Sequence, residues 1–235
     1  MKWTVIDPPL PSFARWKALF SKHPNVSSLR AMEYDQLSRT PIEGRVLDVG
    51  GGKNALYQKH LPKGIDYVSV NIDPNIEPTH ILAPGEAFPL DDDQFDACVC
   101  LNTLEHIYDP RFVLDEIFRT LKPGGRVIIT VPFIFRIHGH PDDFFRATPS
   151  WWQETLRQTG FASTSFLPLV WGRAVSAASI SGYRLKIGRL NFHLSHFWDI
   201  LYAKLAFRNS SGTYSGKRGE RVTNVAPGWF IVAEK

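Results

Sequence analysis

The sequence predicts an α/β protein built on a doubly wound, mostly parallel sheet of seven strands. Short apolar runs rich in β-branched residues alternate with helical patterns along most of the 235 residues. A glycine turn at residues 50–52 follows the first run, and polar residues stand where three runs end: Asp48, Asp73 and Asn102. Ligands of such sheets bind at the carboxyl ends of the strands. This edge is therefore the predicted cofactor site.

The predicted elements divide the chain into four parts of one domain. Two helices, at residues 12–20 and about 27–39, carry apolar residues at helical spacing and make an N-terminal cap over residues 1–43. A cofactor-binding core spans residues 44–170, a basic insertion spans 171–224, and a last strand lies within 225–235. The strands are expected around Val46 and at 66–73, 79–82, 96–101, 126–132, 161–170 and 228–235.

Three helices are expected within the core. One begins at Asn54, directly after the glycine turn, and ends near Pro62. A helix N-terminus there would offer unpaired N–H groups to a ligand. A second begins at Asp109, a good N-cap followed by proline. The third covers residues 151–160 and ends at a glycine.

Composition agrees with a single cytoplasmic domain. Hydrophobic residues make up 43% of the chain and charged residues 21%, which suits one large domain with a substantial core. We find no secretory signal and no apolar run of the roughly 18 residues that a membrane span needs. Cys98 and Cys100 share one face of a predicted strand, so they cannot bridge each other, and we expect two buried thiols.

The glycine turn leaves two cofactor classes to compare. Gly50, Gly52 and Ala55 satisfy a loose dinucleotide pattern, and Asp73 follows at about the expected distance. Asp48 opposes that interpretation, because a carboxylate beside the turn would repel a pyrophosphate. It would attract the ammonium and sulfonium groups of S-adenosylmethionine. Asp48 therefore favours S-adenosylmethionine over NAD(P).

Four segments, in this order, carry a family resemblance: VLDVGGGKN, VSVNIDP, FPLDDDQFDACVCLNTLEHIYDP and LKPGGRVIITVPF. Over roughly residues 44–170 the chain resembles the class I S-adenosylmethionine-dependent methyltransferases. The resemblance implies a Rossmann-like sheet with an antiparallel last strand. It also implies roles for individual residues. The methionine end of the cofactor would be held by Asp48, Gly50, Gly51 and Gly52. The ribose would bind to Asp73, and the region near the methyl group would be bordered by Leu101 and Asn102. The adenine would lie beside Gly85 and Glu86.

The segment HGHPDDFFRAT, residues 138–148, is the candidate acceptor site. It follows the predicted fifth strand at the carboxyl edge of the sheet and is dense in polar groups. We expect His140 or His138 to act as the base and Arg146 to orient the acceptor or to pair with a neighbouring aspartate. An ion-paired loop without proton transfer fits equally well. A His-x-His pair with no clear third ligand predicts no metal site. Glu105 and His106 are interpreted as either site residues or packing residues.

The basic insertion admits three hypotheses. Residues 171–224 contain nine lysines and arginines against two acids, a net charge of +7, whereas the whole chain carries +4. It could be a packed lid or homodimer surface, a contact with an anionic membrane or lipid-linked substrate, or a surface for a phosphorylated or nucleic-acid substrate. The many aromatic residues favour the first. Dispersed basic residues make nucleic acid unlikely as a partner. Residues 210–220 are expected to form a mobile loop.

The sequence therefore predicts an S-adenosylmethionine-dependent methyltransferase that acts on a small-molecule, glycan or lipid-linked acceptor, with oxygen as the expected target. Similar H-x-x-P-D-x-F-R-x-T segments occur in methyltransferases linked to sugar pathways, which is an analogy only. The alternatives are an NAD(P)-dependent oxidoreductase and a cofactor-binding domain without catalysis.

Overall fold

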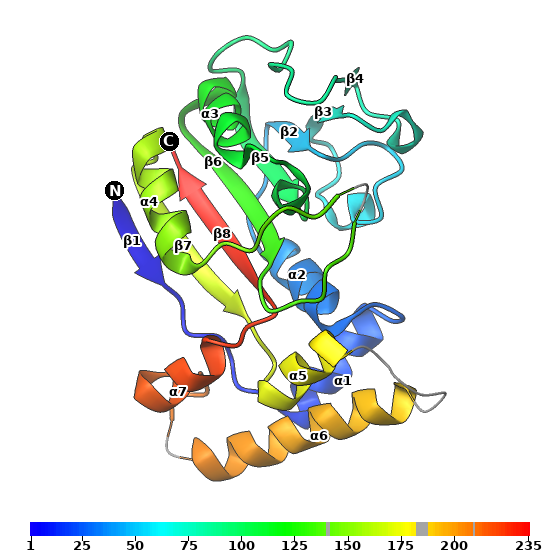
Figure 1. Ribbon diagram of the computed structural model, residues 1–235, viewed down its shortest axis with the longest axis vertical. Coiled ribbons are helices and arrows are strands. Elements are labelled where there is room, and N and C mark those ends of the chain that lie inside the picture. Colours follow the sequence, from blue (N-terminus) through cyan, green and yellow to red (C-terminus); the bar gives the residue numbers. More distant parts are fainter. Residues whose placement is uncertain (140–141, 182–187, 209) are drawn as a thin grey trace.

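A computed structural model describes residues 1–139, 142–181, 188–208 and 210–235. Its centre is one eight-stranded sheet with helices on both faces (Figure 1). The strand order is β1-β7-β8-β6-β5-β2-β3-β4. Only β8 runs antiparallel to its neighbours, β6 and β7. The strands are β1 (Lys2–Val5), β2 (Arg45–Val49), β3 (Asp66–Asn71), β4 (His80–Ile81), β5 (Phe95–Leu101), β6 (Leu121–Pro132), β7 (Ser163–Leu169) and β8 (Gly228–Glu234).

The doubly wound, mostly parallel sheet with an antiparallel last strand is confirmed, but it contains one strand more than expected. β1 adds to the edge of the sheet by pairing in parallel with β7, from Lys2 opposite Ser163 to Val5 opposite Phe166. Trp3 packs on Phe166 with ring centroids 5.1 Å apart. The four residues of β1 form too short a pattern to predict a strand. Their partner strand, β7, is also far away in the sequence, since Lys2 pairs with Ser163.

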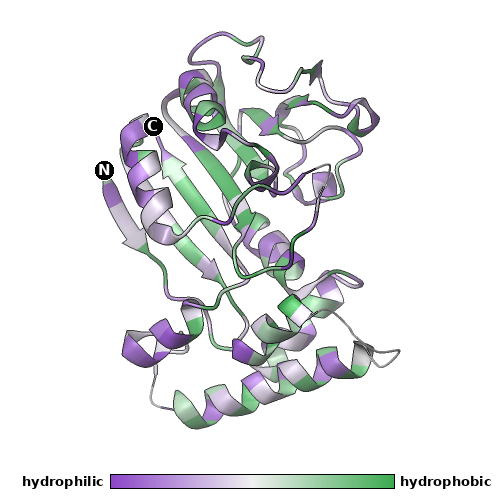
Figure 2. Cartoon of the chain, viewed as in Figure 1, coloured by the Kyte–Doolittle hydropathy of each residue, from purple (hydrophilic) through white to green (hydrophobic). Residues whose placement is uncertain are grey.

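The two faces of the sheet bury separate hydrophobic clusters. Cys98 and Cys100 of β5 face α3 (Pro110–Thr120) and α4 (Pro149–Thr159). The alternate residues Ala97 and Val99 face α1 (Phe13–Lys22) and α2 (Ser28–Leu37). Both cysteines are buried and free, as expected. Figure 2 shows β6 and β8 as mostly hydrophobic, which agrees with central strands covered on both sides.

Local signals explain which helices were predicted correctly. Asp109 caps α3 by accepting the N–H of Phe112 at 3.3 Å, with Pro110 at the first helical position. The helix expected from Asn54 is wrong, because only the 3₁₀ turn η1 (Gln58–His60) forms there. Asn54 instead donates its backbone N–H to the carbonyl of Ile76 and its side chain to Glu77. The chain after the glycine turn is thus held to the next loop, and Pro62 leaves no room for a longer helix.

The basic insertion is mainly helical. It contains α5 (Arg173–Ser181), α6 (Gly188–Ala206) and α7 (Gly216–Thr223). α7 occupies part of the segment expected to be a loop. α6 lies across the end of the molecule toward which β6 and β7 point (Figure 1). Among the described helices, none is long and apolar enough to cross a membrane.

Candidate active site

Strand order brings most of the predicted cofactor residues to one edge. β5, β2 and β3 are adjacent and parallel, so their carboxyl ends meet. Residues 50–52 follow β2, Asn102 follows β5, and Asp73 lies two residues beyond the end of β3. Asp73 had been expected to close that strand, which instead ends at Asn71. The side chain of Asn71 donates to the carbonyl of Gly50 at 2.7 Å and so links the two loops.

Asp48 is fully buried beneath the glycine turn. Its Oδ1 accepts the hydroxyl of Tyr57 at 2.8 Å, and its Oδ2 accepts the hydroxyl of Tyr67 at 2.6 Å. The Tyr67 hydroxyl also accepts the backbone N–H of Gly52. Burial raises the pKa of Asp48 to about 7, and the two hydroxyl donors limit that rise. Any influence of Asp48 on a cofactor therefore passes through the turn that it supports.

The three glycines are required by the packing of the turn itself. A Cβ on Gly51 would lie 2.0 Å from Oδ2 of Asp48. On Gly50, where φ is +87°, it would lie 2.1 Å from Oγ1 of Thr103. On Gly52 it would lie 2.2 Å from the carbonyl oxygen of Ile76. The turn is thus packed against β2 and two other loops, and this close approach fixes its position at the carboxyl edge of the sheet.

The other predicted cofactor residues lie around this turn. Asp73 is half-buried and accepts the backbone and side-chain N–H groups of Asn75 on Oδ1. Gly85 and Glu86 lie in the exposed loop after β4, where Glu86 accepts the N–H of Ala83 at 2.7 Å. Leu101 is buried at the end of β5. These groups fit the cofactor. The carboxylate of Asp73 can accept hydrogen bonds from ribose hydroxyls, and the close-packed glycine turn lets its backbone approach the methionine group.

Asn102 connects the N-terminal cap to the sheet. Its φ is +52°, and its side-chain amide donates to Oγ1 of Thr130 at 2.9 Å and to Oε2 of Glu33 at 3.3 Å. Glu33, on α2, is buried, which raises its pKa, while its ion pair with Arg30 at 3.2 Å opposes the rise. The cap therefore reaches the carboxyl end of β5 through one buried acid.

The residues predicted to contact the acceptor lie in the loop after β5 and in the loop after β6. Glu105 is 1% exposed, and its carboxylate has no hydrogen-bond partner among the described residues except its own backbone N–H. Burial raises the pKa of Glu105 to about 8. His106 lies beside it, with Nε2 3.7 Å from Oε1 of Glu105. The ring of His138 stands edge-on to the ring of His106, with centroids 5.3 Å apart.

The rest of the histidine-rich segment forms an ion pair. Arg146 makes a two-pronged contact with Asp143, and Asp143 also accepts the backbone N–H of His138 at 2.9 Å. The Arg146 guanidinium holds the pKa of Asp143 at about 2. The expected pairing of Arg146 with a neighbouring aspartate is thus present, and it fixes the backbone at His138. His140, the other expected base, lies outside the described residues.

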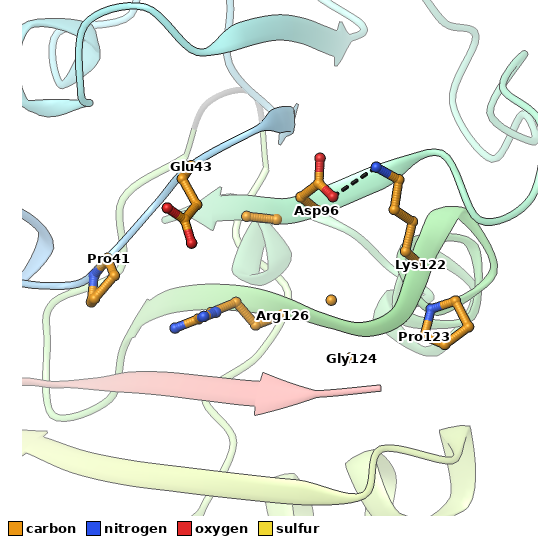
Figure 3. Close-up of a pocket in the computed structure, with 9 residues that line it drawn as sticks. Pro41, Glu43, Asp96, Lys122, Pro123, Gly124 and Arg126 are labelled. Atoms are coloured by element: carbon orange, nitrogen blue, oxygen red, sulfur yellow. Dashed lines mark hydrogen bonds and ion pairs between the residues drawn. The ribbon is translucent and has the colours of Figure 1, made fainter.

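A shallow cavity of about 200 Å³ lies elsewhere on the protein (Figure 3). Residues at the start of β5 and β6 line it, and Lys122 pairs with Asp96 across it at 2.7 Å. These are the amino-terminal ends of the parallel strands. The cavity therefore lies at the opposite edge of the sheet from the glycine turn and takes no part in the candidate site.

Sequence patterns missed three contributors to the site. Tyr57 and Tyr67 reach Asp48 from other segments, and no local pattern marks them as its partners. Glu33 left a detectable signal, because it stands four residues from both Leu29 and Leu37 on the buried face of α2. An acid on an apolar helix face is an unusual observation that points to a buried polar contact.

Comparison with known proteins identifies the family. A profile described as a methyltransferase domain matches residues 47–129, from β2 into β6. An uncharacterised methyltransferase of Mycobacterium sp. (strain KMS) is 31% identical over 100 residues, which cover 39% of this chain and 40% of that protein. Residues 47–129 therefore match a methyltransferase domain, the family that the sequence motifs indicate. Both matches agree with the predicted methyltransferase family and its cofactor, S-adenosylmethionine, and neither match is to an NAD(P)-dependent oxidoreductase.

Solved structures of low identity show the same fold. A methyltransferase from Thermotoga maritima, described as a possible histamine N-methyltransferase, aligns with a TM-score of 0.53 and 16% identity over 95% of this chain and 94% of that one. The Haloferax volcanii putative methyltransferase in complex with the Trm112 activator gives 0.51 and 18% over 94% of each chain. The matched part of the chain spans about 40% of the length of the curated relatives.

Proposed function

We propose that this protein transfers a methyl group from S-adenosylmethionine to an acceptor hydroxyl on a small molecule, a glycan or a lipid-linked sugar. The observation that carries the proposal is one short segment, Asn102 to His106, which joins the cofactor edge to proton-accepting side chains. The cofactor supplies a methyl group already activated on sulfur. The protein's main task is then to align the acceptor, because proximity and orientation lower the barrier of such a displacement.

The cofactor would be held along the carboxyl ends of three strands. The glycine turn, residues 50–52, would approach the methionine end, and Asp73 would accept hydrogen bonds from the ribose hydroxyls. Leu101 and Asn102 would border the methyl group, and Gly85 with Glu86 would border the adenine. Asp48 would support the turn from below, since it has no exposed atom.

The acceptor would lie beside Glu105, His106 and His138. An oxygen nucleophile gains from a neighbouring group that takes its proton. His138 is the described residue of the predicted pair that can do so, because burial lowers its pKa and favours the neutral ring. Arg146 acts as a positioning residue, since Asp143 already occupies its guanidinium.

We further propose that α6 rests on an anionic membrane surface. Leu194, Phe197, Trp198 and Leu205 are exposed along one side of the helix. Acids are lacking on this side, because the only acid of α6, Asp199, points inward and accepts the N–H groups of Ala174 and Val175. Lys204 lies over the ring of Phe13 at 5.7 Å, next to this apolar side. Exposed aromatic residues flanked by positive charge suit anionic lipid. A single domain in the cytoplasm remains the expected setting.

Ligand-induced thermal shifts test the proposed activity. We expect S-adenosylhomocysteine at about 100 times its dissociation constant to stabilise the protein by roughly 2.7 kcal/mol, and NAD to give no shift. Asp73→Ala should reduce the shift, whereas Asp91→Ala, an exposed acid in the turn before β5, should not. Methyl transfer to hydroxyl-bearing acceptors then tests catalysis. Stabilisation by NAD but not by the homocysteine ligand would contradict the proposal.

A further inference from the structure

Glu105, His106 and His138 place three possible ligand atoms close together. One atom from each side chain lies within 4.8 Å of the others. Glu105 is buried, the His106 side chain is 15% exposed and the His138 side chain is 38% exposed. The cluster therefore leads from the protein interior to solvent beside the predicted acceptor site. Its members come from the loops after β5 and β6, next to Asn102.

A hydrogen bond determines which ring nitrogen of His106 carries the proton. Nδ1 of His106 lies at hydrogen-bond distance from the backbone carbonyl of Asp142. Nδ1 of His138 lies 3.3 Å from the carbonyl of Arg136. A carbonyl oxygen only accepts, so Nδ1 of His106 donates its hydrogen, and the neutral His106 ring keeps a lone pair on Nε2. Nδ1 of His138 also lies 3.4 Å from Nη2 of Arg146 and 3.4 Å from Oδ2 of Asp143. In either tautomer the neutral His138 ring keeps a lone pair on one nitrogen.

The charges around the cluster leave one acid without a counterion. Glu33 pairs with Arg30, and Asp143 pairs with Arg146. Glu105 has no ion pair with an arginine or lysine among the described residues, and its carboxylate has no hydrogen bond there except with its own backbone N–H. A buried carboxylate beside two imidazole rings that can each offer a lone pair is a set with more acceptors than donors. Such a set is costly unless a cation or a proton joins it.

We propose that Glu105, His106 and His138 bind one divalent transition-metal ion of the zinc class. Two histidines and one carboxylate are an established ligand set for zinc with an open coordination position. The backbone carbonyl on Nδ1 of His106 matches the way in which metal-binding histidines are usually oriented. A tetrahedral ion with bonds of about 2.1 Å holds its ligands roughly 3.4 Å apart. The ligand atoms, now within 4.8 Å, would close by no more than about 1.4 Å.

The ion would face the acceptor. Its open position could bind an acceptor oxygen and lower the pKa of the hydroxyl, in place of direct proton transfer to His138. This role rests on the proposed methyltransferase function, whereas binding of the ion does not. Metal binding and methyl transfer can therefore fail separately. The sequence pattern did not predict this site, because Glu105 and His106 follow β5 whereas His138 follows β6, and only the fold brings them together.

Cobalt titration of the untagged, chelator-treated protein tests the site. Co²⁺ bound to nitrogen and oxygen ligands absorbs visible light, so binding is read without any enzymatic activity. We expect one Co²⁺ per chain, displaced by Zn²⁺. Changes to groups behind a metal ligand weaken binding by about 10–100-fold, so Glu105→Gln and His106→Ala should each weaken it by at least 100-fold. His138→Ala should do the same.

Controls make each outcome decisive. His80→Ala, at the edge strand β4 and outside the cluster, should bind Co²⁺ like the wild type. Glu105→Gln keeps the buried shape, and an unchanged thermal shift with S-adenosylhomocysteine would show that it folds. If the wild type binds no Co²⁺, or if all three ligand variants bind it with wild-type affinity, the proposal is wrong. Absence of methyl transfer in a protein that binds Co²⁺ would overturn only the proposed function.

Discussion

Asp48 shows how the surroundings of one residue change its expected role. Its place at the end of a buried strand predicted a carboxylate aimed at a cationic cofactor. The structure covers that carboxylate with Tyr57, Tyr67 and the glycine turn. The acid could be found from the sequence because strand, acid and glycines are consecutive. Its tyrosine partners could not, because Tyr67 reaches it only through the register of β2 with β3.

The raised pKa of Asp48 predicts a dependence of stability on pH. Between its ordinary value of 3.8 and about 7, the folded protein holds a proton on Asp48 that the unfolded chain has lost. The free energy of unfolding should therefore fall as pH rises through this window. Asp48→Asn cannot titrate, so its stability should fall less between pH 5 and pH 8. Urea unfolding at both pH values measures the difference, with Asp91→Asn as the control. Parallel curves for wild type and Asp48→Asn would contradict the assignment.

Gly51→Ala tests whether the turn is fixed by its contact with Asp48. The added Cβ would lie 2.0 Å from a carboxylate oxygen, and two tyrosine hydroxyls prevent that group from moving aside. We expect a loss of about 1–3 kcal/mol in the free energy of unfolding and weaker binding of S-adenosylhomocysteine. Gly64→Ala has a positive φ but open space around it. It should cost about 1–2 kcal/mol without affecting the ligand. Equal ligand affinities for the two variants would rule out this role of the contact.

At the level of helices and strands, predictions held where local signals were complete. α3 has an N-cap, a proline at its first position and an apolar face, and it forms as expected. The residues after the glycine turn have an apolar pattern but a proline nearby, and only a 3₁₀ turn forms. α7 was missed because its eight residues include two glycines and few apolar side chains. It is held by Val222, which is fully buried in a tertiary contact.

The exposed side of α6 predicts membrane binding that depends on Leu194 and Trp198. These side chains are 43% and 57% exposed, although so many aromatic residues had been expected to be packed. The double variant Leu194→Ser/Trp198→Ser should bind vesicles of phosphatidylcholine with one quarter phosphatidylglycerol at least tenfold more weakly than wild type. Tyr108→Ser, which removes an 85% exposed aromatic ring outside the helix, should leave binding unchanged.

The alternative occupant of this helix side is a second copy of the chain. Co-sedimentation with vesicles and analytical ultracentrifugation distinguish the two. We expect a monomer that binds anionic vesicles and does not bind vesicles of pure phosphatidylcholine, because Lys204 carries a positive charge next to the apolar side. A dimer that dissociates in the double variant and ignores vesicles would replace the membrane by a homodimer interface.

Across the whole molecule, the N-terminal residues serve two separate ends of the sheet. β1 completes the edge beside β7, while α2 sends Glu33 to Asn102 at the cofactor edge. The two helices were predicted from their spacing, but neither contact could be. Pairing of β1 depends on β7, and the orientation of Glu33 depends on how α2 packs on β8 and β7. Such contacts join segments that are distant in sequence, so only the assembled fold determines them.

This division of roles predicts that stability and ligand affinity can be changed independently. Deletion of residues 2–6 removes β1 and its contact between Trp3 and Phe166. Each kcal/mol lost should lower Tm by about 2–4 °C in a chain of this size. The affinity for S-adenosylhomocysteine should stay within about twofold, because β7, β8 and β6 separate β1 from the site.

Glu33→Ala should weaken that affinity, because it frees the side chain of Asn102 and leaves Arg30 without its partner. Arg39→Ala, an exposed position just after α2, is the matched control and should change neither quantity. Calorimetric titration and thermal melts of the three variants measure both. A deletion that weakens ligand binding as much as Glu33→Ala would mean that the two ends of the sheet are coupled.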